Sequence, residues 1–173
     1  AWRAFALAAN QATRRGKGVF QNDRLQLRQY ATSTAKVWKR PLLVIPPWIN
    51  KYYILDLREK NSFVRWAVNE GMTVFVVSWV NPDERLAHKD FEDYLVEGPL
   101  AALDAIQKAT GEADANVVGY CLGGTLLAAK LGYPAGRKQK RMARATVRSA
   151  RDGRAPAAAP QGCSTRVQQP ARA

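Results

Sequence analysis

Three nearly continuous apolar runs divide the chain and predict its strands: residues 41–47, 72–79 and 115–118. A strand with one face in water would alternate apolar and polar residues. Unbroken runs instead indicate strands that are buried on both faces of a mostly parallel sheet. Pro46 and Pro47 end the first run, and a loop follows at the carboxyl end of that strand.

Helical patterns fill the two intervals between these runs. Residues 61–62 can cap a helix that ends at Gly71. The second interval predicts helices over 90–97 and 100–110, which Pro99 separates or kinks. This alternation of strand and helix predicts right-handed crossovers and a sheet with helices on both faces.

The first 40 residues predict a separate N-terminal segment. It contains a short surface helix over 2–12 and extended stretches at 19–23, 25–30 and 36–39. The partial alternation in these stretches is typical of edge strands. Residues 1–40 are therefore interpreted as an N-terminal helix and edge-strand segment.

A glycine-flanked turn joins the third apolar run to an alanine- and leucine-rich helix. Gly119 and Gly123 lie two residues on either side of Cys121, and Gly124 follows. This is the Gly-x-nucleophile-x-Gly spacing of the nucleophile elbow in α/β-hydrolases, in which small residues let strand and helix close tightly. The sequence thus predicts a partial α/β-hydrolase core over residues 41–133.

The same turn suggests a chemistry for its cysteine. Cys121 would begin the helix, where the helix dipole and free N–H groups favour a thiolate. The Leu122 N–H would face the oxygen of an acyl group on that sulfur, forming half of an oxyanion hole. The alternative is an ordinary buried cysteine in a turn. The strand before and the helix after it favour the nucleophile.

The charge of the chain is concentrated at one end. Residues 134–173 contain ten of the 27 Lys and Arg but one of the 14 Asp and Glu, so the first 133 residues carry only +4 of the net +13. The body therefore has an ordinary solvated surface, which argues against a nucleic-acid binder. The end segment is rich in Ala, Arg and Pro, which predicts a disordered basic tail over 134–173.

Other sequence features point to a cytoplasmic protein. We find no signal peptide and no apolar window of the roughly 18 residues needed to span a membrane. Cys121 and Cys163 lie in unlike contexts and do not resemble a disulfide framework. The chain begins with Ala rather than Met, which suggests an incomplete or processed N-terminus.

The sequence resembles the polyhydroxyalkanoate synthases of the poly(3-hydroxybutyrate) polymerase type. The stretches that carry the resemblance include GVFQNDRLQLRQY, PLLVIPPWINKYYILDL, NSFVRWAVNEGMTVFVVSWVNPDE and NVVGYCLGGTLLAA. It implies that Cys121 takes (R)-3-hydroxyacyl groups from coenzyme A, and that Trp48 and Ile49 border the second oxyanion N–H. It further implies a polyester granule as partner, allows for a homodimer, and requires no cofactor or metal.

The resemblance stops near Lys130. Such a synthase would continue to a catalytic Asp and His, whereas here the single histidine, His88, precedes Cys121. Arg144 and Arg148 interrupt a faint further strand. The tail is interpreted as the product of a reading-frame shift or of a mis-assembled end, with an evolved basic tail as the alternative. Asp56, just past the loop at Trp48 and Ile49, could support the site as a carboxylate behind it, but a capping or surface role is favoured. Cys163 is expected to be incidental.

The leading hypothesis is therefore a synthase fragment that is inactive as a polymerase by itself. A second hypothesis is a small cysteine-dependent α/β-hydrolase, which would also need a later histidine. A third is a non-catalytic protein that binds polyester granules or an intact synthase through exposed apolar surface. Tail charge alone would support a nucleic-acid binder, whose affinity should collapse with salt.

Overall fold

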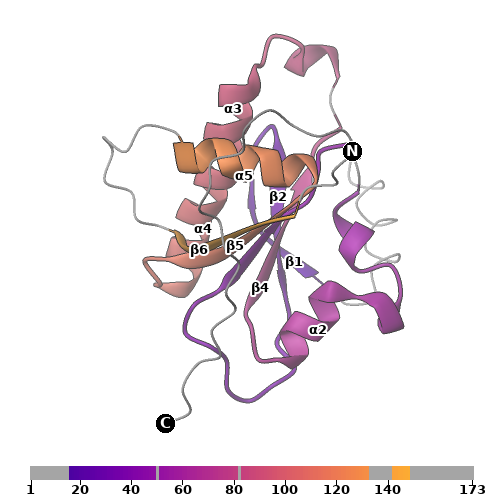
Figure 1. Ribbon diagram of the computed structural model, residues 1–173, viewed down its shortest axis with the longest axis vertical. Helices are drawn as coiled ribbons and strands as arrows, with labels where there is room; N and C mark the ends of the chain where they lie inside the picture. Colours follow the sequence, from indigo (N-terminus) through magenta and orange to yellow (C-terminus); the bar gives the residue numbers. More distant parts are fainter. Residues whose placement is uncertain (1–15, 50, 82, 133–141, 149–173) are drawn as a thin grey trace, which may run out of the picture.

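The computed structural model describes residues 16–49, 51–81, 83–132 and 142–148, and these form one six-stranded sheet (Figure 1). The strand order across the sheet is β1-β2-β4-β3-β5-β6. The strands are β1 (Gly16–Gln21), β2 (Leu25–Tyr30), β3 (Leu42–Ile45), β4 (Val74–Trp79), β5 (Ala115–Tyr120) and β6 (Met142–Arg148).

The sheet is antiparallel at one edge and parallel through its centre. β1 and β2 form a hairpin, and β2 pairs antiparallel with β4. β3 lies between β4 and β5 and is parallel to both, as β6 is to β5. All four residues of β3 are buried. This confirms the prediction that the unbroken apolar runs are interior strands of a mostly parallel sheet.

Helices cover both faces, as predicted. They are η1 (Tyr52–Leu55), η2 (Glu59–Asn61), α2 (Phe63–Asn69), η3 (Glu84–Leu86), α3 (Phe91–Leu95), η4 (Val96–Leu100), α4 (Ala101–Thr110) and α5 (Leu122–Gly132). α4 and α5 pack against one face around Leu43, Phe75 and Ile106. α2 packs against the other around Val44 and Val76 (Figure 1). Each central strand therefore contributes alternate residues to two cores.

The boundaries of α2 follow from two local signals that the sequence carried. The Ser62 hydroxyl accepts a hydrogen bond from the Arg65 N–H at 2.8 Å, which caps the helix. The same hydroxyl donates to the fully buried Asp56 carboxylate at 2.5 Å. Gly71 follows the helix with a left-handed φ of 79°. Ser62 is thus the side-chain cap of α2, whereas Asp56, expected in a capping or surface role, is buried and accepts a hydrogen bond from that cap.

Pro99 kinks a continuous helical segment instead of separating two helices. α3 runs through the π-turn η4 directly into α4, and Pro99 lies inside that turn. A π-turn accommodates the missing N–H of proline without ending the helix. The turn also packs closely against β4, because a Cβ at Gly98 would lie 2.7 Å from the Trp79 ring.

The prediction of an edge strand over 36–39 is wrong. These residues form no strand; they run along the end of α2 instead. The Trp38 N–H donates to the Gly71 carbonyl, and its ring Nε1 donates to the Glu70 carbonyl, both at 2.8 Å. The Gly71 carbonyl thus accepts the backbone N–H of Trp38, which in a strand would have bonded to a neighbouring strand.

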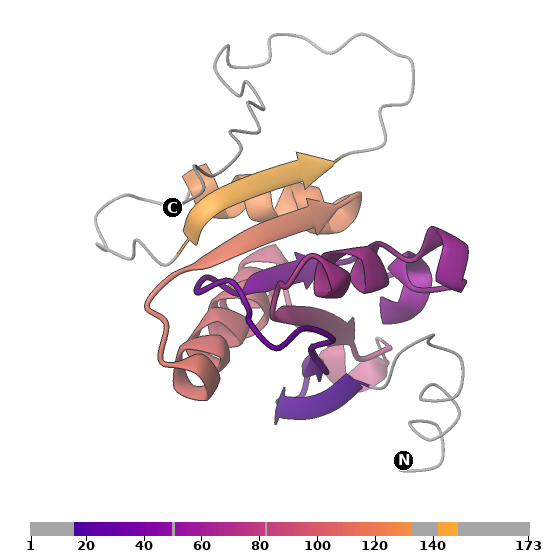
Figure 2. The same ribbon diagram turned by 90° about the horizontal axis from the view of Figure 1, so that it is seen from below.

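A second prediction fails at residues 142–148. We expected this stretch to belong to a disordered tail, but it forms β6 beside β5 at the sheet edge (Figure 2). A register shift near its start changes which residues face inward. Met142, Ala145 and Val147 consequently pack on the same core, while Arg144 is exposed. Because of this bulge, the inward-facing residues of β6 do not alternate regularly with the outward-facing ones along the sequence.

The remaining predictions about the chain ends cannot be compared with the structure. The helix over 2–12, the rest of the segment 134–173 and Cys163 lie outside the described residues. Within the described ranges, no helix is long and apolar enough to cross a membrane.

The burial of β3 predicts a large difference between two leucine truncations. Leu43 is fully buried in β3, whereas Leu57 is 52% exposed. Leu43→Ala should lower the free energy of unfolding by about 2–5 kcal/mol, because it leaves a cavity at the centre of the sheet. Leu57→Ala should change it by less than about 0.5 kcal/mol. Urea unfolding measures both, and equal effects would contradict the assigned core.

Candidate active site

The chain turns at Cys121 with an unusual backbone conformation. Cys121 follows β5, precedes α5, and has φ 53°, the sole positive φ of a non-glycine residue in the described ranges. Its carbonyl accepts hydrogen bonds from the Gly124 and Thr125 N–H groups at 2.8 and 3.2 Å, which forms the first turn of α5. A left-handed residue with a side chain costs about 1–2 kcal/mol. The surrounding structure must therefore impose this conformation.

Glycines around the turn allow the strand and the helix to approach each other. A Cβ at Gly119 would lie 2.5 Å from the Gly123 carbonyl oxygen and 2.7 Å from the Gly124 Cα. A Cβ at Gly123 would overlap the carbonyl oxygen of Ile45. No side chain fits at either position without moving backbone. The structure thus accounts for both glycines of the predicted elbow, with Gly124 as the close neighbour of Gly119.

The same close contact brings the loop after β3 beside the elbow. We call residues 46–49 the β3 loop. The Pro46 carbonyl oxygen is 3.0 Å from the position of a Gly123 Cβ, and Ile45 pairs with Gly119 across the sheet. Trp48 is half-buried in this loop, and Ile49 is 69% exposed. Leu122 is the first residue of α5. Predicted site residues from two separate segments therefore lie at the same end of the sheet, where the parallel strands β3 and β5 finish.

An aromatic cluster supports the β3 loop, and sequence analysis did not identify it. Trp48 lies against Tyr94, Trp79 and Phe91, with ring centroids 5.2, 6.2 and 6.3 Å apart. The Trp79 Nε1 donates to the Pro46 carbonyl at 2.7 Å. A signal was present: Trp48 and Trp79 each lie at the carboxyl end of a predicted parallel strand, and such ends meet at the same end of the sheet.

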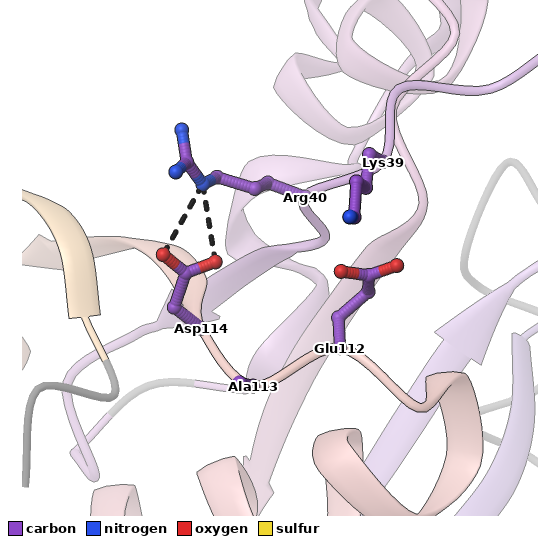
Figure 3. Close-up of a pocket in the computed structure, with 5 residues that line it drawn as sticks. All are labelled: Lys39, Arg40, Glu112, Ala113 and Asp114. Atoms are coloured by element: carbon purple, nitrogen blue, oxygen red, sulfur yellow. Dashed lines mark hydrogen bonds and ion pairs between the residues drawn. The ribbon is translucent and has the colours of Figure 1, made fainter.

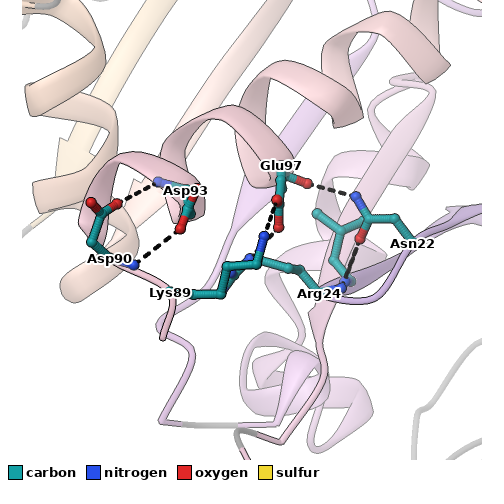
Figure 4. A network of polar contacts seen from close by, with 7 residues as sticks. Asn22, Arg24, Lys89, Asp90, Asp93 and Glu97 are labelled. Atoms are coloured by element: carbon teal, nitrogen blue, oxygen red, sulfur yellow. Dashed lines mark hydrogen bonds and ion pairs between the residues drawn. The ribbon is translucent and has the colours of Figure 1, made fainter. Parts of the chain in front are cut away.

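A polar network adjoins this cluster (Figure 4). The Glu97 carboxylate accepts from Lys89 Nζ and from Arg24 Nε, both at 2.5 Å. The lysine hydrogen bond, together with the arginine, lowers the Glu97 pKa from its ordinary value of 4.5, against a smaller opposing effect of burial. The Arg24 guanidinium lies 4.3 Å from the Tyr94 ring centroid. The network thus joins the β1–β2 turn to α3 and η4.

Two further candidate groups are the His88 ring and the Cys121 thiol itself. His88 is exposed in a turn after η3, in agreement with its interpretation as a solvated loop histidine. Cys121 itself is half-exposed and has a free thiol. Across the described ranges, no three His, Cys, Asp or Glu side chains come together as metal ligands.

A charged pocket lies at the amino ends of the parallel strands, whereas Cys121 lies at their carboxyl ends (Figure 3). Its lining includes Lys39, Arg40, Glu112 and Asp114. Arg40 Nε donates to both Asp114 carboxylate oxygens, at 3.1 and 3.2 Å. These residues precede β3 and β5, so the pair links the amino ends of two strands. Ligands of α/β sheets bind at the carboxyl ends, where Cys121 lies.

Known proteins similar to this chain are polyester polymerases. Residues 2–67 match the family described as "Poly-beta-hydroxybutyrate polymerase (PhaC) N-terminus". The chain is 55% identical over 143 residues to the poly(3-hydroxyalkanoate) polymerase subunit PhaC of Rhizobium meliloti (strain 1021), and 52% identical to the poly(3-hydroxyalkanoate) polymerase of Methylorubrum extorquens. Each alignment covers 83% of this chain but only 23% and 24% of the relative. The chain spans about a quarter of the length of these relatives.

Solved structures resemble the chain only weakly. The carboxylesterase CesB (YbfK) of Bacillus subtilis has a TM-score of 0.49 at 13% identity, covering 84% of this chain and 47% of its own. The assignment of a partial α/β-hydrolase fold rests on the sheet, its covering helices and the elbow after β5.

The close approach at the elbow predicts the sign of one substitution. In an unobstructed helix, Gly→Ala stabilises by about 1 kcal/mol. At Gly123 the new Cβ would overlap the Ile45 carbonyl, so Gly123→Ala should destabilise by about 1–3 kcal/mol. Gly111→Ala shows the cost of backbone strain alone, since that position has no atom within 4 Å but a left-handed φ of 76°, and it should destabilise by about 1 kcal/mol. Thermal unfolding that shows Gly123→Ala to be stabilising would contradict the packed elbow.

The Glu97 network predicts a dependence of stability on pH. A lowered folded-state pKa means that the contribution of Glu97 is fully present above the unfolded value of about 4.5 and is lost as pH falls through the folded pKa. Wild-type protein should therefore lose stability below about pH 4.5 more steeply than Glu97→Gln. Urea unfolding between pH 3 and 7 measures the two slopes. Parallel slopes would show that Glu97 is not held by Lys89 and Arg24.

Proposed function

The chain belongs to the poly(3-hydroxyalkanoate) polymerase family, and on that premise we propose that it accepts an acyl group on Cys121. The donor is an (R)-3-hydroxyacyl thioester of coenzyme A. The observation that carries the proposal is the left-handed turn at Cys121, which begins α5 beside the β3 loop. A cysteine does not adopt this backbone conformation without cost, so a role for its thiol is the simplest reason for it.

The proposed step is a thioester exchange. The Cys121 sulfur attacks the thioester carbonyl carbon and forms a new carbon–sulfur bond, while the carbonyl oxygen gains negative charge. The bond to the coenzyme A sulfur then breaks, and coenzyme A leaves as a thiol with the proton that Cys121 gave up. Both donor and product are thioesters of similar energy, so the exchange needs no further driving force.

The surroundings of Cys121 support this step in two ways. The start of α5 places a helix dipole and backbone N–H groups next to the reacting thioester, where they stabilise the negative charge that develops during the exchange. The developing oxyanion would be bound by the Leu122 N–H and by an N–H of the β3 loop at Trp48 or Ile49. The Pro46 backbone close to Gly123 supports this pairing, since it keeps the loop at the end of the sheet where the thiol lies.

We propose that Cys121 accepts one acyl group and does not transfer it further. A thiol that repeatedly transfers acyl groups needs a base within about 3 Å and a group that orients the base. His88 is the one histidine of the sequence, and it is exposed in a turn. We therefore propose that the 173-residue chain does not polymerise its substrate. Binding to polyester granules, dimer formation and a cytoplasmic location stay predictions.

Mass spectrometry of the intact chain tests the acyl acceptance. Incubation with 3-hydroxybutyryl-CoA should add one hydroxybutyryl group, and Cys121→Ala should abolish the addition. Cys163→Ala is the matched control, because it removes the other cysteine and should keep the addition. Absence of the adduct in wild-type protein, or its loss in Cys163→Ala, would overturn the proposal.

The same reaction distinguishes acceptance from turnover. Coenzyme A release should stop after about one equivalent, because nothing in the proposed site removes the acyl group. Steady release with free hydroxybutyrate would instead identify a small cysteine hydrolase. Steady release with polymer would show that this chain is an active polymerase. Either outcome would contradict the single acylation.

A further inference from the structure

We propose that Arg24 is a positioning residue for the β3 loop: stacked on Tyr94, it holds Trp48 in place beside the elbow. The inference deepens the proposed function, because Trp48 borders the N–H expected to bind the oxyanion. Arg24 itself lies at the start of β2, far from Cys121 in the sequence. Its influence would pass through aromatic rings.

The β3 loop depends on contacts outside itself. Its first residue, Pro46, accepts the hydrogen bond from the Trp79 indole, and Trp48 packs edge-on against the same indole with interplanar angle 83°. The remaining support for Trp48 comes from Phe91 and Tyr94 in α3. Phe91 is 44% exposed and its ring centroid is 6.3 Å from that of Trp48, whereas Tyr94 is the nearer ring at 5.2 Å. Tyr94 is therefore the main lateral contact.

Tyr94 is held in turn by Arg24. The guanidinium carbon lies 4.3 Å from the Tyr94 ring centroid, which is a close cation–π contact. A planar guanidinium can stack over a ring, and an ammonium group cannot. The Tyr94 ring also touches Trp79, at a centroid distance of 5.9 Å. Arg24, Tyr94 and Trp48 thus form a continuous series of side-chain contacts from the β1–β2 turn to the β3 loop.

Arg24 is fixed firmly enough to serve as the base of this series of contacts. The Arg24 side chain is 1% exposed, and its Nε donates a hydrogen bond to the Glu97 carboxylate. Its N–H donates to Asn22 Oδ1 at 2.9 Å, and its carbonyl accepts from the Val80 N–H at 2.7 Å. Among the described residues, Nη1 and Nη2 are buried and have no hydrogen-bond partner. Burying a cation with two unused nitrogens is unfavourable for stability alone.

A purely structural role for Arg24 is the alternative, since the Glu97 ion pair ties the β1–β2 turn to η4 (Figure 4). The two roles differ in what they change. A structural residue would alter the stability of the fold and every reaction of Cys121 together. A positioning residue would alter only the reaction that needs the oxyanion N–H.

The test compares two reactions of the Cys121 thiol in Arg24→Lys. Lysine keeps the charge opposite Glu97 but loses the planar stack on Tyr94. Acylation by 3-hydroxybutyryl-CoA forms an oxyanion, whereas alkylation by iodoacetamide displaces iodide and forms none. Arg40→Lys is the matched control, because Arg40 also pairs with a carboxylate but at the amino ends of the parallel strands. Tyr94→Leu removes the ring and leaves the Arg24–Glu97 pair.

We expect Arg24→Lys and Tyr94→Leu to slow acylation about ten-fold, less than the roughly 10²–10³-fold lost when an oxyanion donor is removed. Their alkylation rates should stay within about two-fold of wild type, and Arg40→Lys should change neither reaction. Unchanged acylation in Arg24→Lys would overturn the inference. An equal fall in both reactions would also overturn it and leave the structural role.

A spectroscopic measurement separates this inference from the proposed function. In protein labelled with 5-fluorotryptophan, the Trp48 fluorine resonance is identified by its loss in Trp48→Phe. It should shift in Arg24→Lys and stay unchanged in Arg40→Lys. If wild-type protein takes no acyl group, the proposed function fails, and this resonance alone decides whether Arg24 positions Trp48. An unchanged resonance would refute the positioning.

Discussion

The structure depends on backbone-to-backbone contact between three elements at the end of β5. Gly119 touches the start of α5, and Gly123 touches the end of β3, with no space for a Cβ at either site. The contact forces Cys121 into a left-handed conformation that a non-glycine residue does not adopt unaided. The strain is local, and the two cores on either face of the sheet must stabilise it.

Because of this constraint, the carboxyl and amino ends of the parallel strands are held by different kinds of contact. At the carboxyl ends, the turn at Cys121 packs against the β3 loop, and Trp48 of this loop contacts further aromatic rings. At the amino ends, a half-exposed ion pair between Arg40 and Asp114 links two strand starts. An exposed pair of this kind contributes at most about 1 kcal/mol. The charged pocket at the amino ends is therefore a weaker candidate site than the carboxyl ends, where ligands of α/β sheets bind.

The N-terminal hairpin has a larger part in the site than its position at the sheet edge suggests. Arg24 and Asn22 connect its turn to Glu97, and Arg24 continues through Tyr94 to the β3 loop. The matched family region, residues 2–67, includes both this hairpin and the β3 loop. The edge hairpin and the β3 loop therefore share one contact network.

The sequence by itself determined the interior strands, the caps of α2 and the glycine spacing around Cys121, because each follows from local periodicity or from backbone conformations that few residues allow. It missed β6, because a bulge shifted the alternation, and it misassigned residues 36–39, whose partners lie on α2. Only the tertiary structure decided that Arg24, Trp48 and Tyr94 lie together. Their contacts join residues that are 46 and 70 positions apart, and local patterns carry no information about such pairs.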